Sequence, residues 1–424
     1  MFRRFKNEQL RSLQSFCIGS IFGFALIYIF LDIELLLLYI INSSSLSLII
    51  EQSLLSVLIV IQFYILLTKK HSIYIYIYIL IILWHVSISL LKGYDSRVIF
   101  QASSNDGFFL IILTWFHQHK WTRKGLTSIL IALTLLHVLF VILEYLGITS
   151  SIVNTWTAYG SDNFQQGSRY TALFMAPGLL SFYSAIITAY AFADFKINKD
   201  YLSLILILLG IFLGISSGNR SYILASFFIL IIIFFWSPKF TNYNKIKKRY
   251  LFIILSLILC FLLSIIYIYS EAILFLMDRF QYEIILEDLE TRTTGSAGFV
   301  PILESLFSFD AIFGTTSSNP QNGLNGVFYE GNFYTLSNSY IASLASLGWF
   351  FGSIFLLIYF TAIKRYHAFT KVKYMNDTNN IATCLYFSML ASSVVLLFDN
   401  LINHVLIITI MMMAYSPKWK ELKR

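Results

Sequence analysis

Charged residues are scarce in this chain of 424 residues, of which only 12% are Asp, Glu, Lys or Arg while 58% are hydrophobic. Soluble globular domains carry about 25% charged residues, so the composition excludes a soluble class and favours a polytopic membrane protein. Cysteine is also scarce: Cys17, Cys260 and Cys384 all lie in apolar runs, which gives neither a disulfide framework nor a metal cluster. Because the sequence shows no metal-ligand spacing, glycine-rich phosphate loop or nucleophilic triad, we expect no metal and no cofactor.

Lysine and histidine are both missing from residues 270–339, the only long stretch that cannot sit in a membrane. This stretch holds nine acidic residues and only two basic ones, Arg279 and Arg292. Its Asn-Pro and Asn-Gly pairs, between residues 319 and 326, are turn formers. Residues 301–309 follow the spacing of an amphipathic helix, which needs an apolar surface to lie on. We therefore expect a large functional loop that packs on a membrane domain.

Elsewhere, apolar runs of membrane-spanning length alternate with short polar joints. They predict an all-α polytopic protein with about twelve transmembrane helices, a single integral membrane domain over residues 1–424 and the large loop between the ninth and tenth helices. We expect Pro177-Gly178 to break the sixth span, and Arg220 to sit in a turn between the seventh and eighth. The expected spans are 15–31, a second that ends at 69–71, then 73–91, 98–116, 126–146, 170–193, 202–215, 222–236, 250–269, 340–360, 381–398 and 401–415.

Lysine and arginine set the expected orientation, because cytoplasmic joints carry an excess of both. With the N-terminus in the cytoplasm, 24 of the 30 Lys and Arg residues fall on the cytoplasmic side. Both termini are then cytoplasmic and the large loop is outside. The net charge of +8 reflects this topology and contact with the lipid bilayer, so we expect no nucleic-acid partner.

Three of the six outer cations are arginines beside flexible or broken backbone: Arg169, Arg220 and Arg292. The planar guanidinium stays charged and donates two parallel hydrogen bonds, which suits a phosphate or diphosphate. Each arginine alone is equally explained as a membrane-interface anchor or as the partner of a carboxylate. All three arginines lie on the expected outer side, where Lys and Arg are rare, and this favours an anion-binding site over three separate structural roles.

The order of these features resembles the superfamily of O-antigen polymerases and O-antigen ligases, glycosyltransferases of the bacterial inner membrane. The resemblance covers about residues 165–355 and rests on short motifs: Arg169 with Phe174-Met175-Ala176-Pro177-Gly178, Ser216-Ser217-Gly218-Asn219-Arg220, Arg292 at the start of the loop, and Asn338-Ser339-Tyr340 ahead of Leu347-Gly348.

The resemblance implies a polymerase that joins undecaprenyl-diphosphate-linked repeat units of O-antigen or a related surface polysaccharide at the periplasmic face. It implies catalytic roles for Arg220 and Arg292, and substrate binding by Arg169, Ser337, Asn338 and Tyr340. It also allows a chain-length regulator as a protein partner. A carboxylate should accept the acceptor proton, and Asp162, Glu144 and the loop acids all stay open.

Two other functions remain as alternatives. O-antigen ligases typically carry a His-Asn pair where this chain has Ser337-Asn338, and no histidine lies between His137 and His367; this departure favours polymerase over ligase. A transporter or flippase of lipid-linked sugars would use the arginines along a translocation path. Such proteins often contain repeated halves, and we see no internal repeat.

Overall fold

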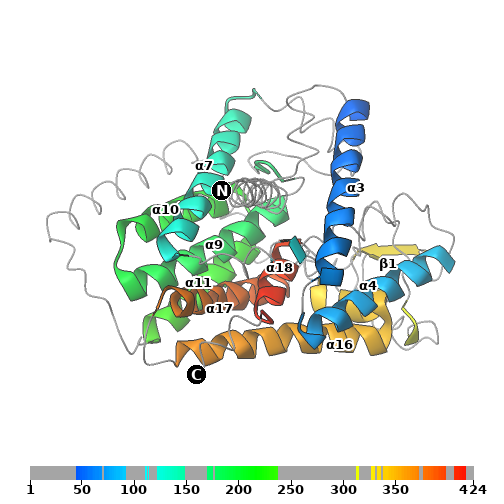
Figure 1. Ribbon diagram of the computed structural model, residues 1–424. Coiled ribbons are helices and arrows are strands. Elements are labelled where there is room, and N and C mark those ends of the chain that lie inside the picture. Colours follow the sequence, from blue (N-terminus) through cyan, green and yellow to red (C-terminus); the bar gives the residue numbers. More distant parts are fainter. Residues whose placement is uncertain are drawn as a thin grey trace, which may run out of the picture.

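The computed structural model describes the helical parts of the chain and a few loop segments. The described residues are 44–68, 71–91, 110–111, 113, 122–148, 170–174, 177–236, 312–314, 326–329, 332–335, 338–371, 376–397 and 405–416. Nine helices and one short hairpin lie within them (Figure 1). In chain order these are α3 Ser44–Thr68, α4 Ile73–Leu91, α7 Arg123–Tyr145, α9 Pro177–Asn198, α10 Tyr201–Ser216, α11 Arg220–Phe235, β1 Gly326–Tyr329, β2 Asn332–Thr335, α16 Ser339–Thr370, α17 Asp377–Val395 and α18 Val405–Met413.

The helical class expected from the apolar runs is confirmed for the described residues. Four stretches among the described residues are long and apolar enough to cross a membrane: Ile73–Leu91, Arg123–Tyr145, Gly178–Asn198 and Leu347–Thr370. α4 begins and ends where the hydropathy pattern predicts. The expected spans at 15–31 and 250–269, most of 98–116, and the helix at 301–309 lie outside the described residues.

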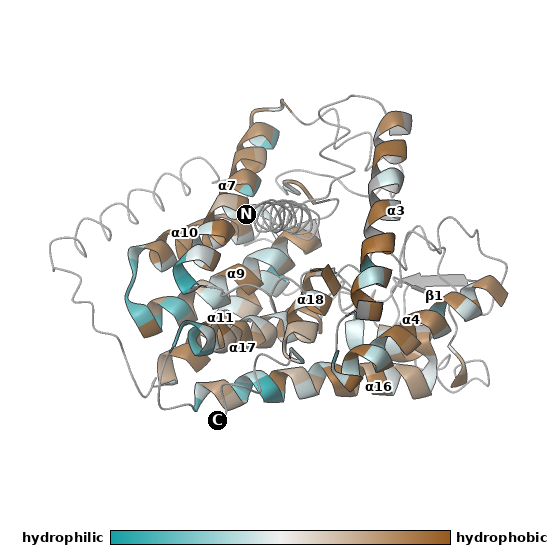
Figure 2. Cartoon of the chain, in the orientation of Figure 1, coloured by the Kyte–Doolittle hydropathy of each residue, from teal (hydrophilic) through white to brown (hydrophobic). Residues whose placement is uncertain are grey.

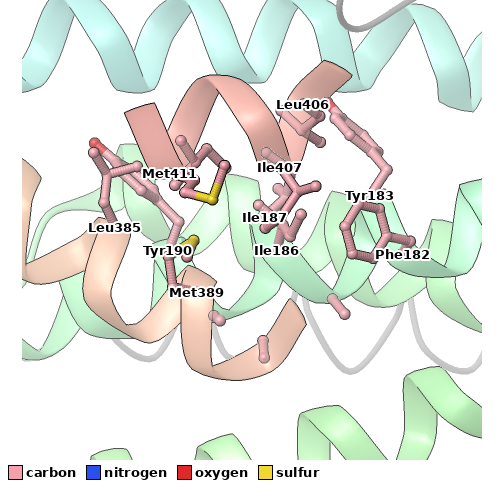
Figure 3. Packing of buried hydrophobic residues seen from close by; sticks show 14 of the residues in the cluster. Phe182, Tyr183, Ile186, Ile187, Tyr190, Leu385, Met389, Leu406, Ile407 and Met411 are labelled. Carbon is pink, nitrogen blue, oxygen red and sulfur yellow. The ribbon is translucent and has the colours of Figure 1, made fainter. Parts of the chain in front are cut away.

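α9 is the central helix of the bundle. In the apolar part of α9, 78% of the residues are buried, against 28–39% in the other three stretches. The reason is that α10, α11 and α17 all pack against α9. The close view in Figure 3 shows Tyr183 and Ile187 of α9 among side chains of α17 and α18, including Met389 and Met411. Small residues allow the close approach: a Cβ at Gly210 of α10 would lie 2.5 Å from Thr188 Oγ1.

Two details of α9 and α11 correct the sequence-based expectations. Pro177 does not interrupt a span that begins at residue 170; it is the first residue of α9. Proline is well suited to that position, since the first helical N–H has no partner inside the helix. Arg220 likewise is not in a turn but is the first residue of α11, because Asn219 caps the helix by accepting the Ser221 N–H at 3.2 Å.

α16 is kinked rather than straight. Gly348 has φ +80° and ψ 165°, so Ser339–Thr370 consists of two helical pieces that meet at this residue. A Cβ at Gly348 would lie 2.5 Å from the Ile312 carbonyl oxygen and 2.7 Å from the Gly314 nitrogen. The expected single span at 340–360 is therefore wrong in shape, and residues 312–314 of the expected loop pack directly on the kink.

Tyrosine hydroxyls join α16 to the helices around it. Tyr366 of α16 donates to the Ile410 carbonyl of α18 at 2.7 Å. In the opposite direction Tyr415, just after α18, donates to the Ile358 carbonyl of α16. The guanidinium carbon of Arg365 lies 4.4 Å from the centre of the Tyr415 ring. These contacts fix α18 on α16 without any ion pair between the two helices.

Candidate functional site

The candidate site is at the joint between α10 and α11, because this joint carries the one candidate arginine that the structure describes. Ser217 ends α10, and Gly218 follows with φ +59°, a conformation that favours glycine. Asn219 then starts α11, which places Arg220 in its first turn. The amino end of a helix carries partial positive charge, and Arg220, half-buried at this end, places a guanidinium beside it.

The segment that follows Arg169 lies against this same joint. Tyr170 donates its backbone N–H to the carbonyl oxygen of Ser216 at 3.1 Å. Ser181, in the first turns of α9, lies 3.3 Å from the Ser221 hydroxyl in the first turn of α11. The stretches around two of the three arginine motifs are thus adjacent in space, although Arg169 itself lies outside the described residues.

Glu144, near the carboxyl end of α7, holds the segment 170–174 from the other side. Its Oε2 accepts the backbone N–H groups of Thr171 at 3.0 Å and Ala172 at 3.2 Å. Its Oε1 accepts the Thr171 hydroxyl at 2.7 Å. The carboxylate therefore has three donors in this one segment, contacts that the sequence did not predict.

Asn338 and Tyr340, both predicted to bind substrate, contact the carboxyl end of α17. Asn338 caps α16: its Oδ1 accepts the N–H groups of Tyr340 at 3.0 Å and Ile341 at 3.2 Å. Its Nδ2 donates to the Leu397 carbonyl at 3.3 Å. Tyr340 donates its hydroxyl to the Ser393 carbonyl at 3.0 Å. These bonds provide a structural role for both residues, while Ser337 and Arg292 lie outside the described part of the chain.

Residues 312–314 connect the expected outer loop to the membrane helices. Gly314 is buried against Gly348 of α16, and the Phe313 ring lies 6.4 Å from that of Trp84 in α4. Trp84 in turn lies 4.9 Å from Phe351, just after the kink. The kink therefore forms the surface on which this part of the loop rests.

A charged cluster that was not predicted from the sequence lies at the opposite end of the bundle. Arg123, the first residue of α7, places Nη1 3.1 Å from both carboxylate oxygens of Asp194 in α9. Its Nη2 contacts Asp200, the cap of α10. Ser203 and Asn198 also donate to Asp194, at 2.5 Å and 2.8 Å. Figure 2 shows hydrophilic residues gathered at this α9–α10 joint, while the bodies of the helices are hydrophobic.

This cluster and the candidate site mark the two ends of α7. Arg123 lies at its start and Glu144 near its end. Lys199 and Arg220, assigned to opposite sides of the membrane, likewise lie beyond the two ends of α10. An acidic residue at the end of an apolar run, as Asp194 is, was the available signal for the cluster, because such a residue requires a partner.

Comparisons of the chain with protein-family models, with curated proteins and with solved structures found no match. Within the described residues, no group of three or more His, Cys, Asp or Glu side chains is placed to hold a metal ion. The described part of the α10–α11 joint contains a guanidinium, a helix amino end and a backbone segment held by a carboxylate.

Proposed function

We propose that this chain is a polymerase of undecaprenyl-diphosphate-linked repeat units of O-antigen or a related surface polysaccharide. It would act at the periplasmic face of the bacterial inner membrane, with both termini in the cytoplasm and about twelve membrane spans. One observation carries the proposal: the hydrogen bond from the Tyr170 N–H to the Ser216 carbonyl. It joins the segment next to Arg169 to the joint next to Arg220, as a two-arginine diphosphate site requires.

In the proposed reaction, the bond between the anomeric carbon and the diphosphate oxygen of the donor breaks. A new bond forms from that carbon to a hydroxyl of the incoming lipid-linked repeat, and a base takes the hydroxyl proton. Negative charge grows on the leaving diphosphate. Fixed donors aimed at that charge stabilise the transition state most, which is the role proposed for Arg220 and Arg292, with Arg169 binding the same group.

Lysine substitution tests this role. Arg220→Lys keeps the charge but loses the paired hydrogen bonds of the guanidinium, so it should fail nearly as badly as Arg220→Ala, and Arg292→Lys should behave in the same way. Arg279→Ala removes another arginine of the loop and serves as the matched control. It should leave polymer length unchanged. The measurement is the surface glycan of cells that carry each variant at matched membrane levels.

The glycan pattern also separates the alternatives. A polymerase defect leaves single repeats attached to the outer-membrane lipid anchor. A ligase defect leaves long polymer on undecaprenyl diphosphate and none attached, and a flippase defect retains single repeats on the cytoplasmic side. Normal long chains in both lysine variants would remove the arginines from the chemistry.

A further inference from the structure

We propose that Glu144 is a positioning residue of the diphosphate site, whose carboxylate holds the segment 170–174, which follows Arg169 in the chain, against the α10–α11 joint that carries Arg220. The inference rests on the proposed function and adds to it a residue on a different helix. Glu144 comes from the last turn of α7, whereas the segment that it holds precedes α9.

The segment has a backbone shape that needs support. Ala172 has φ +54°, a left-handed conformation that costs a non-glycine residue about 1 kcal/mol or more. This conformation turns the successive N–H groups of Thr171 and Ala172 toward one point, which makes a concave anion-binding backbone. The Glu144 carboxylate occupies that point, with oxygens 2.7–3.2 Å from the three donors of these two residues.

Contacts on both sides transmit this support to the chain next to Arg169. Tyr170 is bonded to Ser216, as described above. At the other end, Leu173 and Phe174 are buried, and the Phe174 ring stacks on His137 of α7 at 4.6 Å. With one end fixed on α10 and the other on α7, a change at residues 171–172 must be absorbed at Tyr170, the immediate neighbour of Arg169.

The same geometry argues against Glu144 as the proton acceptor. Both of its oxygens already accept hydrogen bonds, and proton uptake would weaken the bonds that hold the segment. Glutamine separates the two roles. Its carbonyl oxygen can accept the two backbone N–H groups while its amide donates to the Thr171 hydroxyl oxygen, so Glu144→Gln retains the support but cannot act as a base.

Binding of undecaprenyl diphosphate to the purified full-length chain in detergent is the test, measured as the rise in unfolding temperature with ligand concentration. Wild-type protein should be stabilised. Glu144→Ala should need about tenfold more ligand for the same rise, since loss of charge-assisted hydrogen bonds has effects of that order. Glu144→Gln should stay within about twofold of wild type. Tyr366→Phe is the matched control, because it removes a buried hydrogen bond between α16 and α18, to the Ile410 carbonyl at 2.7 Å, on helices that make none of the described contacts with the segment.

A double-variant cycle with Arg169→Ala shows whether Glu144 acts through that arginine. Residues that act as one unit give non-additive effects, so Glu144→Ala should weaken binding no further in the Arg169→Ala background. Full additivity would assign Glu144 to general stability and overturn the inference. Thr171→Val removes one of the three donors with a smaller risk to folding, and it should weaken binding by about threefold.

Each remaining outcome decides between the inference and the function on which it rests. Unchanged affinity in Glu144→Ala, or in Thr171→Val if the alanine variant does not fold, overturns the positioning role and leaves the proposed function intact. A Glu144→Gln protein that binds ligand but makes no polymer would make Glu144 the base instead. If undecaprenyl diphosphate does not stabilise even the wild-type protein, the proposed function itself fails.

Discussion

Arg123 and Asp194 form a buried ion pair in which a single guanidinium nitrogen, Nη1, lies 3.1 Å from both carboxylate oxygens. The Arg123 side chain is 7% exposed and that of Asp194 0%. Charges this deeply buried are costly unless they are paired. The pair therefore ties the start of α7 to the end of α9, and its loss should be felt by the whole bundle.

We expect Asp194→Ala to lower the free energy of unfolding by about 3–5 kcal/mol, because it leaves the Arg123 guanidinium buried with less compensation. The double variant Arg123→Met with Asp194→Leu removes both charges and should be less destabilised than Asp194→Ala alone. Thermal unfolding in detergent is the measurement. Lys371→Ala, which changes an exposed cation after α16, is the control. A double variant less stable than Asp194→Ala would contradict the ion-pair account.

Asn338 should act as a helix cap, whatever else it does. Asn338→Asp keeps the oxygen that accepts the Tyr340 and Ile341 N–H groups but loses the Nδ2 bond to the Leu397 carbonyl, so its unfolding temperature should lie between those of the alanine variant and the wild type. Asn338→Ala loses the cap and should cost about 1 kcal/mol. Surface glycan length at matched membrane levels provides the second measurement. If the aspartate variant is stable yet makes no long chains, Asn338 also serves the substrate.

Gly348→Ala should loosen the loop from the kink of α16. The new Cβ would meet the Ile312 carbonyl and the Gly314 nitrogen, and φ +80° is strained for alanine. In a cysteine-free background, a thiol reagent should then label Phe313→Cys several-fold faster. A weakening of the contact by about 1 kcal/mol raises the exposed population by roughly that factor. Phe350→Ala, at an exposed neighbour, should leave the labelling rate unchanged. Equal rates in the Gly348→Ala and parent proteins would show that residues 312–314 do not depend on the kink.

The expected orientation can be checked with two single cysteines, at Asn322 and Lys245. An impermeant thiol reagent should label Asn322→Cys once the outer membrane is permeabilised. Lys245→Cys should be labelled only after the inner membrane is broken, because cytoplasmic joints carry the excess of Lys and Arg. Equal labelling of both would reverse the assignment.

Within the described residues, the positions of the helices were predicted in part from the sequence, and contacts between helices were not. α4 coincides with its apolar run because membrane-length runs of Ile, Leu and Tyr set helix bounds directly. Pro177 was wrongly predicted to break a helix. Proline interrupts helices but is also common as their first residue, and the sequence alone does not separate the two cases. The partner of Asp194 lies 71 positions away, and hydropathy carries no information about a contact at that separation.

For the candidate site, the position of one motif in the fold could be predicted from the sequence, and the contacts that support it could not. The motif Ser216–Arg220 was expected between two helices and lies between α10 and α11, since glycine and asparagine mark turns locally, although Arg220 itself begins α11. The support from Glu144 was not predicted because it depends on the positive φ of Ala172. Glycine or asparagine would indicate such a conformation in a sequence, but alanine does not. Asn338 was assigned to substrate by motif, whereas its described contacts are those of a cap.

The reciprocal tyrosine bonds between α16 and α18 have a consequence for how the last helix finds its place. α18 reads Val-Leu-Ile-Ile-Thr-Ile-Met-Met-Met, a sequence that packs almost equally well after sliding by one turn, about 5.4 Å. The Tyr366 hydroxyl of α16 donates to a carbonyl of α18, and the Tyr415 hydroxyl, just after α18, donates to a carbonyl of α16. Any such slip therefore breaks both bonds at once. The two tyrosine hydroxyls thus fix the axial position of α18, whose side chains are otherwise nearly all apolar. Tyr366→Phe or Tyr415→Phe alone would leave the other hydrogen bond in place.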